Sequence, residues 1–131
     1  MQIHQSAEDY LETILMLTQR MGKVRSIDVV NELGFTKASV SIAMKKLREN
    51  GYIAVDGEGN LTLLEPGREI AERIYSRHRL LQHFFMQLGV DEKTAAEDAC
   101  KAEHILSEQT LEKIREHALQ HDAESTLTKS E

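Results

Sequence analysis

Apolar side chains recur every three or four residues in three stretches of the N-terminal half, a spacing typical of helices packed on one side. The predicted helices cover residues 6–21, 27–33 and 36–50. A hydroxyl residue that can accept a hydrogen bond from the first turn precedes or opens each one: Ser6, Ser26 and Thr36. A glycine follows each apolar stretch and predicts its end: Gly22, Gly34 and Gly51. The second and third helices, joined by a short turn, have the layout of a helix-turn-helix.

After the third helix the pattern changes to two short β-rich runs around a glycine-rich tip at residues 56–60, which predicts a hairpin, the wing of a winged helix. Pro66, the only proline, suits the first turn of a fourth helix that extends to about Leu88. Two further helices are predicted over residues 91–106 and 107–121. Ser107 is the expected cap of the last helix, and its expected buried residues are Leu111, Ile114 and Leu119.

The predicted fold is mainly α, with an N-terminal winged helix-turn-helix and a C-terminal helical domain. We expect a winged-helix domain at residues 1–65, a helical domain at 66–121 and a flexible polar tail at 122–131. A chain of 131 residues has room for two such domains only if they are small, and this favours an oligomer. Small residues on the fifth helix would allow close approach of a second subunit: Ala95, Ala99 and Ala102.

The net charge of −6 is unevenly distributed. Residues 23–50 carry six basic against three acidic residues, whereas residues 91–131 carry five against eleven. A basic segment in an acidic chain suggests contact with DNA at one end and attraction of cations at the other, although an acidic surface also serves solubility alone. The sequence shows no secretory signal and no long apolar run, and it has a single cysteine, Cys100, so we expect a cytoplasmic protein.

The third helix is the predicted DNA-recognition helix. Its exposed early positions are expected to reach base edges: Thr36, Lys37, Ser39, Ser41 and Ile42. Basic residues nearby are expected to contact phosphate: Arg25, Lys45 and Lys46. The acidic wing tip is less suited to phosphate, and some winged helices bind only protein.

Side chains that bind divalent cations recur at helical spacing in three places. The candidate ligands are Asp9 and Glu12, then His78, and then Cys100, Glu103 and His104. Spacings of three and four residues place the members of each group on one helix face. Imidazole and thiolate together with carboxylates favour a divalent transition metal over Mg²⁺ or Ca²⁺. Taken singly, each residue also has a structural interpretation: the two acids can complement a helix dipole, His78 can be a surface residue, and Cys100 can be packing.

Four segments together resemble the diphtheria-toxin-repressor family of iron- and manganese-dependent regulators, over residues 6–120. They are AEDYLETI, KASVSIAMKKLRENGYI, RHRLLQHFF and EDACKAEHILSE. The resemblance implies a homodimer, a metal site between the domains, and repression of metal-uptake genes when metal is plentiful. It places the metal ligands at Asp9, Glu12, His78, Cys100, Glu103 and His104.

The resemblance combines features of two branches of that family. Asp9, Glu12 and the short chain resemble the manganese regulators, whereas Cys100 resembles the iron regulators, where the manganese branch has a carboxylate. Gln82 and Ala96 stand where the iron branch has the ligands of a second site, so we expect that site to be missing. The thiolate favours Fe(II); Mn(II) is the alternative, and Co(II), Ni(II) or Zn(II) are expected substitutes in vitro.

We therefore expect a metal-dependent transcriptional repressor that binds double-stranded operator DNA as a homodimer. The alternative is a winged-helix regulator that works without metal. An enzyme is not expected, because no nucleophile has a neighbouring base and six ligands leave little room for a substrate. His117 and His121, four residues apart, are interpreted as a solvated helix face.

Overall fold

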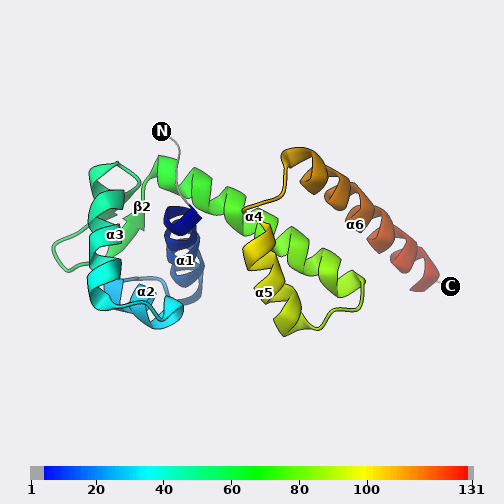
Figure 1. The fold of residues 1–131 in the computed structure, drawn as a ribbon, viewed down its shortest axis with the longest axis horizontal. Coiled ribbons are helices and arrows are strands. Elements are labelled where there is room, and N and C mark those ends of the chain that lie inside the picture. The colour runs from blue at the N-terminus through cyan, green and yellow to red at the C-terminus, as the bar shows by residue number, and fades with distance from the viewer. Residues whose placement is uncertain (1–4, 130–131) are drawn as a thin grey trace. The chain divides into compact units, whose positions relative to one another are not determined.

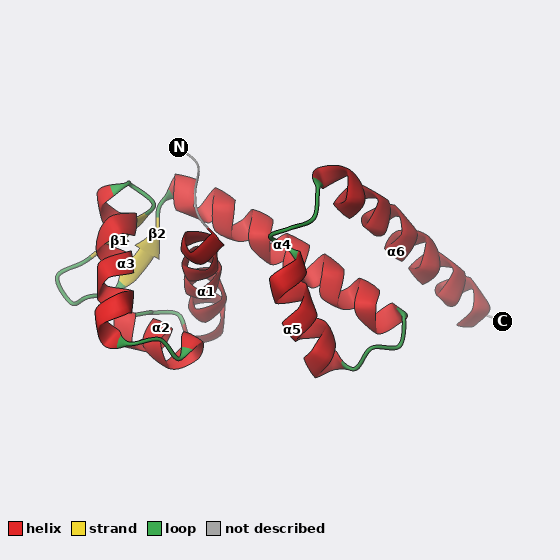
Figure 2. Cartoon of the chain, in the orientation of Figure 1, coloured by secondary structure: helices red, strands yellow, loops and turns green. Residues whose placement is uncertain are grey.

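Two compact units make up the chain, and they divide between Ile74 and Tyr75 within one long helix. The computed structural model describes residues 5–129 (Figures 1 and 2). Its elements in chain order are α1 (Gln5–Met21), α2 (Ser26–Leu33), α3 (Lys37–Glu49), β1 (Ile53–Val55), β2 (Leu61–Leu63), α4 (Glu65–Gln87), α5 (Glu92–Ala102) and α6 (Glu108–Lys129). The mainly helical fold with an N-terminal winged helix-turn-helix is confirmed.

The N-terminal unit packs three helices against a two-stranded antiparallel sheet. Helices α1, α2 and α3 contact one another, β1 contacts α3, and β2 contacts α1. The strands pair Ile53 with Leu63 and Val55 with Leu61. The core consists of apolar side chains from all of these elements, among them Leu11, Ile14, Val24, Val29, Val40, Met44, Leu47 and Ile53.

The caps at the helix starts differ from the prediction at two of three positions. Thr36 is the N-cap of α3, and its hydroxyl accepts a hydrogen bond from the Ser39 N–H at 3.1 Å. Ser6, however, lies inside α1, and Ser26 is the first residue of α2 rather than its cap. At α2 the carboxylate of Asp28 accepts a hydrogen bond from the Arg25 N–H at 2.9 Å. The side chain that pairs with a backbone N–H at the start of this helix therefore comes from the first turn of the helix itself.

The turn between α2 and α3 forms as predicted. Gly34 adopts a φ of 71°, a left-handed conformation that favours glycine, and its N–H donates to the Val30 carbonyl.

The tip of the wing is stabilised by Asp56, whose carboxylate accepts hydrogen bonds from the N–H groups of Glu58 and Asn60, both at 2.9 Å. The side-chain hydrogen bond from Asn60 is the largest of the contacts that lower the pKa of Asp56.

Helix α4 starts at Glu65, one residue before the predicted start of the second domain, and its first part belongs to the N-terminal unit. Gly67 lies so close to the Tyr52 carbonyl that a side chain at this position would collide with the backbone. Arg73 forms an ion pair with Glu8 of α1 at 3.6 Å. These two contacts explain why the compact units divide further along the helix than Pro66 suggested.

In the C-terminal unit the second half of α4 packs with α5 and α6 (Figure 1). Its core is centred on one fully buried residue from each helix: Leu81, Ala99 and Leu111. Ala95 and Ala99 are completely buried within the subunit, so the prediction that this alanine face meets a second subunit is wrong.

Helix α6 begins as predicted, because the Ser107 hydroxyl accepts the Thr110 N–H at 3.1 Å, but two of its features differ. Ala118 is buried, whereas Leu119, predicted to be buried, is 64% exposed. Ala118 lies seven residues after the buried Leu111, close to two turns of helix, and Leu119 lies a further 100° or so around the axis. The helix also continues to Lys129, through much of the stretch predicted as a tail.

A polar contact between α4 and α6 accompanies this extension. His83 Nε2 lies 3.0 Å from a carboxylate oxygen of Asp122, and the Gln87 amide donates to the same carboxylate at 2.9 Å. The hydrogen bond from His83 is the main reason that the pKa of Asp122 is lowered. Among the described residues, every helix is too short or too polar to cross a membrane.

Candidate metal centre and nucleic-acid interface

Three of the six predicted metal ligands come together inside the C-terminal unit. His78 projects from α4, and Glu103 and His104 follow the last residue of α5. A carboxylate oxygen of Glu103 lies 3.5 Å from His78 Nδ1, and the other lies 3.4 Å from His104 Nε2. Glu103 is completely buried, and the side chains of His78 and His104 are only 15% and 3% exposed. The group is therefore a buried carboxylate between two imidazoles.

The helix that was expected to carry these ligands ends earlier than predicted. α5 ends at Ala102, and Glu103 and His104 lie in the turn before α6, just beyond the helix that was predicted to carry them. Glu103 still has nearly helical angles, φ −58° and ψ −24°, and its N–H donates to the Ala99 carbonyl at 3.0 Å. This preserves the neighbourhood that the spacing indicated, because Cys100 Sγ and a Glu103 oxygen lie within 4.8 Å of each other.

The carboxylate of Glu103 is unusual because neither of its oxygens has a hydrogen-bond partner among the residues that the structure describes. Within the same residues, the buried His78 Nδ1 has none either. Buried polar atoms in proteins are nearly always hydrogen-bonded, and leaving one unsatisfied costs about 1 to 3 kcal/mol. Oxygen and nitrogen atoms that lie together in a buried position, with lone pairs that accept no hydrogen bond, are suited to bind a divalent cation. The residues present therefore fit a metal.

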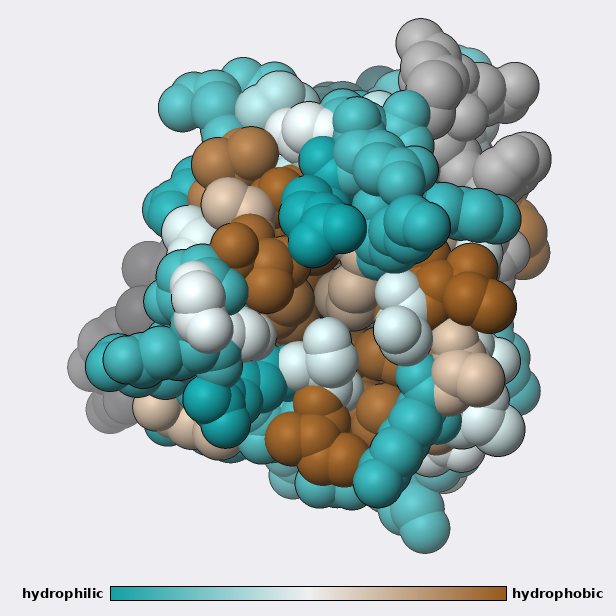
Figure 3. Space-filling view, turned by 90° about the vertical axis from the view of Figure 1, so that its left-hand side faces the viewer, coloured by the Kyte–Doolittle hydropathy of each residue, from teal (hydrophilic) through white to brown (hydrophobic). Residues whose placement is uncertain are grey.

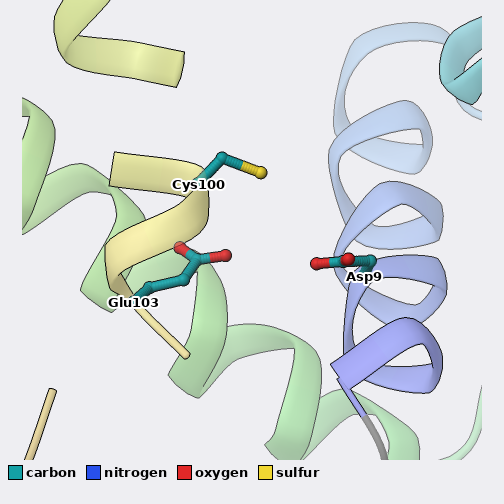
Figure 4. Close-up of side chains that lie close together, drawn as sticks. All are labelled: Asp9, Cys100 and Glu103. Carbon is teal, nitrogen blue, oxygen red and sulfur yellow. The ribbon is translucent and has the colours of Figure 1, made fainter. Parts of the chain in front are cut away.

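The two predicted ligands of the N-terminal unit lie on α1. Figure 4 shows Asp9 projecting from this helix, together with Cys100 in the last turn of α5 and Glu103 just beyond it. Asp9 is half-buried and Glu12 is only 5% exposed. Because α1 includes Gln5, Glu12 lies beyond its first turn, where the helix dipole has little effect. The dipole interpretation of Glu12 is therefore weaker than the sequence suggested.

Cys100 is exposed on α5, which does not fit the interpretation that it is a packed core residue. Among the described residues, His117 and His121 form no contact with the buried group that the structure records. His117 packs its ring edge-to-face against Phe84 at 5.8 Å, and His121 is exposed at the surface of α6.

All eight residues predicted to contact DNA are exposed in the N-terminal unit. They are Arg25, Thr36, Lys37, Ser39, Ser41, Ile42, Lys45 and Lys46. In Figure 3, which views the molecule from the side of α3, hydrophilic side chains surround separate hydrophobic groups. Ile42, 58% exposed, is one apolar side chain of this helix that is available for contact.

Some of these residues also have roles within the fold. The hydroxyls of Thr36 and Ser39 are hydrogen-bonded to each other at the start of α3. The guanidinium of Arg25 donates to the carbonyl of Glu58, so Arg25 holds the wing tip beside the start of α2. The sequence prediction omitted Arg48, which is exposed on the same helix face as Ser41 and Lys45. Arg48 follows Ser41 and Lys45 at spacings of four and then three residues, and this spacing would have placed it on the same helix face.

Comparison with known proteins matches both units. Residues 2–61 match the N-terminal DNA-binding domain of the iron-dependent repressors, and residues 64–127 match the metal-binding and dimerisation domain of the same repressors. A helix-turn-helix transcriptional regulator of Methanocaldococcus jannaschii is 37% identical over 113 residues, which are 85% of this chain and 90% of that protein. The chain belongs to the iron-dependent repressor family. The resemblance to the diphtheria-toxin-repressor group is thereby confirmed.

Other similar proteins are transcriptional regulators, and one solved structure among them is named as manganese-dependent. The transcriptional regulator MntR of Bacillus subtilis is 34% identical over 109 residues, 83% of this chain and 77% of that protein. A structure of a manganese-dependent transcriptional repressor with manganese superposes with a TM-score of 0.78 at 28% identity, over 86% of this chain and 52% of that one. The chain thus spans about half the length of this structure and of the similar manganese regulator SloR. As a member of this family, it is a metal-dependent transcriptional regulator with a DNA-binding and a metal-binding domain.

Proposed function

We propose that this repressor binds operator DNA as a homodimer when a divalent transition metal is held by Asp9, Glu12, His78, Cys100, Glu103 and His104. The observation that carries the proposal is the buried Glu103 carboxylate, which lies between two imidazoles and has no hydrogen-bond donor in the described part of the chain. The family match supports the same conclusion, because the domain that contains this group is a metal-binding and dimerisation domain. Such a repressor acts on DNA in the cytoplasm.

The proposed mechanism couples metal binding to the arrangement of the dimer. Asp9 and Glu12 belong to the unit that carries the recognition helix, whereas the other four ligands belong to the C-terminal unit. A cation that takes ligands from both units stabilises one arrangement of the two recognition helices, and the operator selects that spacing. Without the cation, the carboxylates of Asp9, Glu12 and Glu103 would repel one another if they were brought together.

We propose Fe(II) as the favoured metal and Mn(II) as the alternative. The thiolate of Cys100 is a softer ligand than a carboxylate and favours Fe(II) over Mn(II). Two similar solved structures are manganese regulators by name, which is the reason for testing Mn(II) with equal care. The argument for Fe(II) depends on the thiolate at position 100, so a substitution there tests it.

The test measures operator affinity by gel shift under anaerobic conditions, with Fe(II) and Mn(II) titrated separately. We expect metal to strengthen operator binding. We expect Cys100→Ala to weaken Fe(II)-dependent binding about tenfold or more, because the loss of a residue that only supports a metal ligand already costs about 10- to 100-fold in metal affinity. Asp98→Ala, an exposed α5 residue near Cys100 in the chain, is the matched control and is expected to bind like the wild type.

Two outcomes would contradict the proposal. Operator binding that a chelator leaves unchanged would favour the metal-independent regulator. Identical metal titrations for the wild type and Cys100→Ala, with both proteins folded, would remove Cys100 from the ligand set and with it the argument for Fe(II).

A further inference from the structure

The N-terminal unit has a notch between α3, the start of α2 and the end of β1. It encloses about 240 Å³. Its lining consists of Ser26, Ser41, Met44, Lys45, Arg48 and Val55. Two side chains of the lining are basic, two are hydroxyls and two are apolar, and none is acidic. The chemistry of the notch is therefore that of an anion site.

The two cations of the notch are not neutralised within the fold. Lys45 and Arg48 are exposed, and neither forms an ion pair with any residue in the described part of the chain. Ser41, Lys45 and Arg48 follow one another at spacings of four and three residues, so they lie on one face of α3. Ser26 belongs to a different helix, which means that the fold, not the local sequence, completes the notch.

An acidic residue follows the notch along the chain, but its carboxylate is already engaged. Asp56 comes directly after Val55, and its carboxylate accepts hydrogen bonds from the N–H groups of Glu58 and Asn60 in the wing tip.

Arg20 of α1 offers a comparison with Arg48, because its guanidinium is paired with the carboxylate of Glu32 at 2.9 Å. Arg48 thus differs from Arg20 in having its charge available for a partner outside the chain.

We propose that this notch binds a backbone phosphate of duplex DNA, with Arg48 and Lys45 as its charged donors. The inference rests on the proposed function, since it assumes that this face of α3 meets DNA. A guanidinium donates two parallel hydrogen bonds to phosphate oxygens, and the two serine hydroxyls supply neutral donors beside it. Phosphates border the groove that a recognition helix enters, so a basic notch along that helix positions the protein without selecting a base.

The experiment compares binding of the full chain to a mixed-sequence duplex and to an operator duplex, over a series of salt concentrations. Each phosphate that is neutralised contributes about 0.9 to the slope of log affinity against log salt. Arg48→Ala is therefore expected to reduce this slope by about 0.9 on both duplexes and to weaken binding about tenfold at low salt. Arg48→Lys, which keeps the charge, is expected to retain most of the slope.

Arg20→Ala is the matched control. It also removes an exposed arginine from a helix of the same unit, but one whose charge is already paired. Its slope is expected to equal that of the wild type. Circular dichroism of each variant excludes unfolding as the cause of a change.

The outcomes separate this inference from the proposed function. If Arg48→Ala binds both duplexes like the wild type at every salt concentration, the phosphate notch is wrong, whereas metal-dependent repression is untouched. If it weakens operator binding but leaves the mixed-sequence duplex unchanged, Arg48 contacts a base and the notch is again wrong. If the wild type binds no duplex with or without metal, both the notch and the proposed function fail.

A second measurement locates the contact on the DNA. Single phosphates of the duplex are replaced in turn by neutral methylphosphonates. At one position we expect the wild type to lose affinity while Arg48→Ala loses nothing further, because both changes remove the same contact. Losses that add at every position would overturn the assignment.

Discussion

The substitution Glu103→Gln tests the candidate metal centre in a way that loss of function alone does not. It replaces a completely buried carboxylate by a neutral amide of nearly the same shape. In the metal-free protein the carboxylate is buried and finds no hydrogen-bond donor among the described residues, so neutralising it relieves the desolvation cost of its charge. In the metal-bound protein the same substitution removes a ligand. The variant is therefore expected to be the more stable protein without metal and the less stable one with it.

The size of each effect follows from general magnitudes. A neutral unsatisfied buried group costs about 1 to 3 kcal/mol and a charged one costs more, so Glu103→Gln, which keeps a buried polar group but removes its charge, is expected to stabilise the metal-free protein by the difference, on the order of 1 kcal/mol. An unfolding entropy of about 2.1 cal/mol/K per residue makes 1 kcal/mol equivalent to roughly 4 °C in a chain of 131 residues. A metal at about 100 times its Kd stabilises the wild type by about 2.7 kcal/mol, or roughly 10 °C.

Thermal unfolding is followed by circular dichroism with chelator and then with increasing Mn(II), and again with Fe(II) under anaerobic conditions. The wild type is expected to show a rise in Tm with metal, and Glu103→Gln is expected to show a much smaller one. Glu97→Gln, an exposed residue of α5, is the control for the loss of one negative charge. It is expected to match the wild type in both conditions.

The opposite result has a clear meaning. If His78 or His104 is protonated and holds Glu103 as a buried ion pair, removing the carboxylate costs about 3 to 5 kcal/mol without metal. A variant that is strongly destabilised in chelator and keeps the full metal-induced rise in Tm would refute the assignment of Glu103 as a ligand.

Two further predictions concern the fold. Gly67→Ala is expected to destabilise by about 1 to 3 kcal/mol because its methyl group would collide with the Tyr52 carbonyl, whereas Gly57→Ala, in open space, should change little; urea unfolding compares the two, and equal midpoints would contradict the close approach. Asp91 caps α5, and hydrogen bonds from the Thr94 hydroxyl and N–H lower its pKa below the ordinary 3.8. A lowered folded-state pKa gives stability that is present above 3.8 and lost as pH falls through the folded value. The stability gap between wild type and Asp91→Ala should therefore be constant near neutral pH and shrink below about pH 4, and a gap that widens in acid would contradict this.

Much of the N-terminal unit follows from local pattern. Apolar spacing, Gly34 and Thr36 predicted the helix-turn-helix because these signals act within a few residues of one another, and the glycine-rich tip predicted the wing in the same way. The ligand types and the spacing of Cys100 and Glu103 likewise indicated a transition-metal binder, because the preference of a side chain for a metal is a property of the residue type.

Other features depend on contacts between distant segments, which a local pattern does not contain. The sequence did not reveal that α5 ends at Ala102, that Leu119 faces outward, or that Ala95 and Ala99 are buried within the subunit. The desolvation of Glu103 depends on α4 packing over the end of α5, and the notch beside Arg48 depends on Ser26 from another helix. Residue identity and spacing determined which chemistry the chain carries. Tertiary packing decided which of those groups are buried, unsatisfied or open to a partner, because burial is a property of neighbours that are remote along the chain.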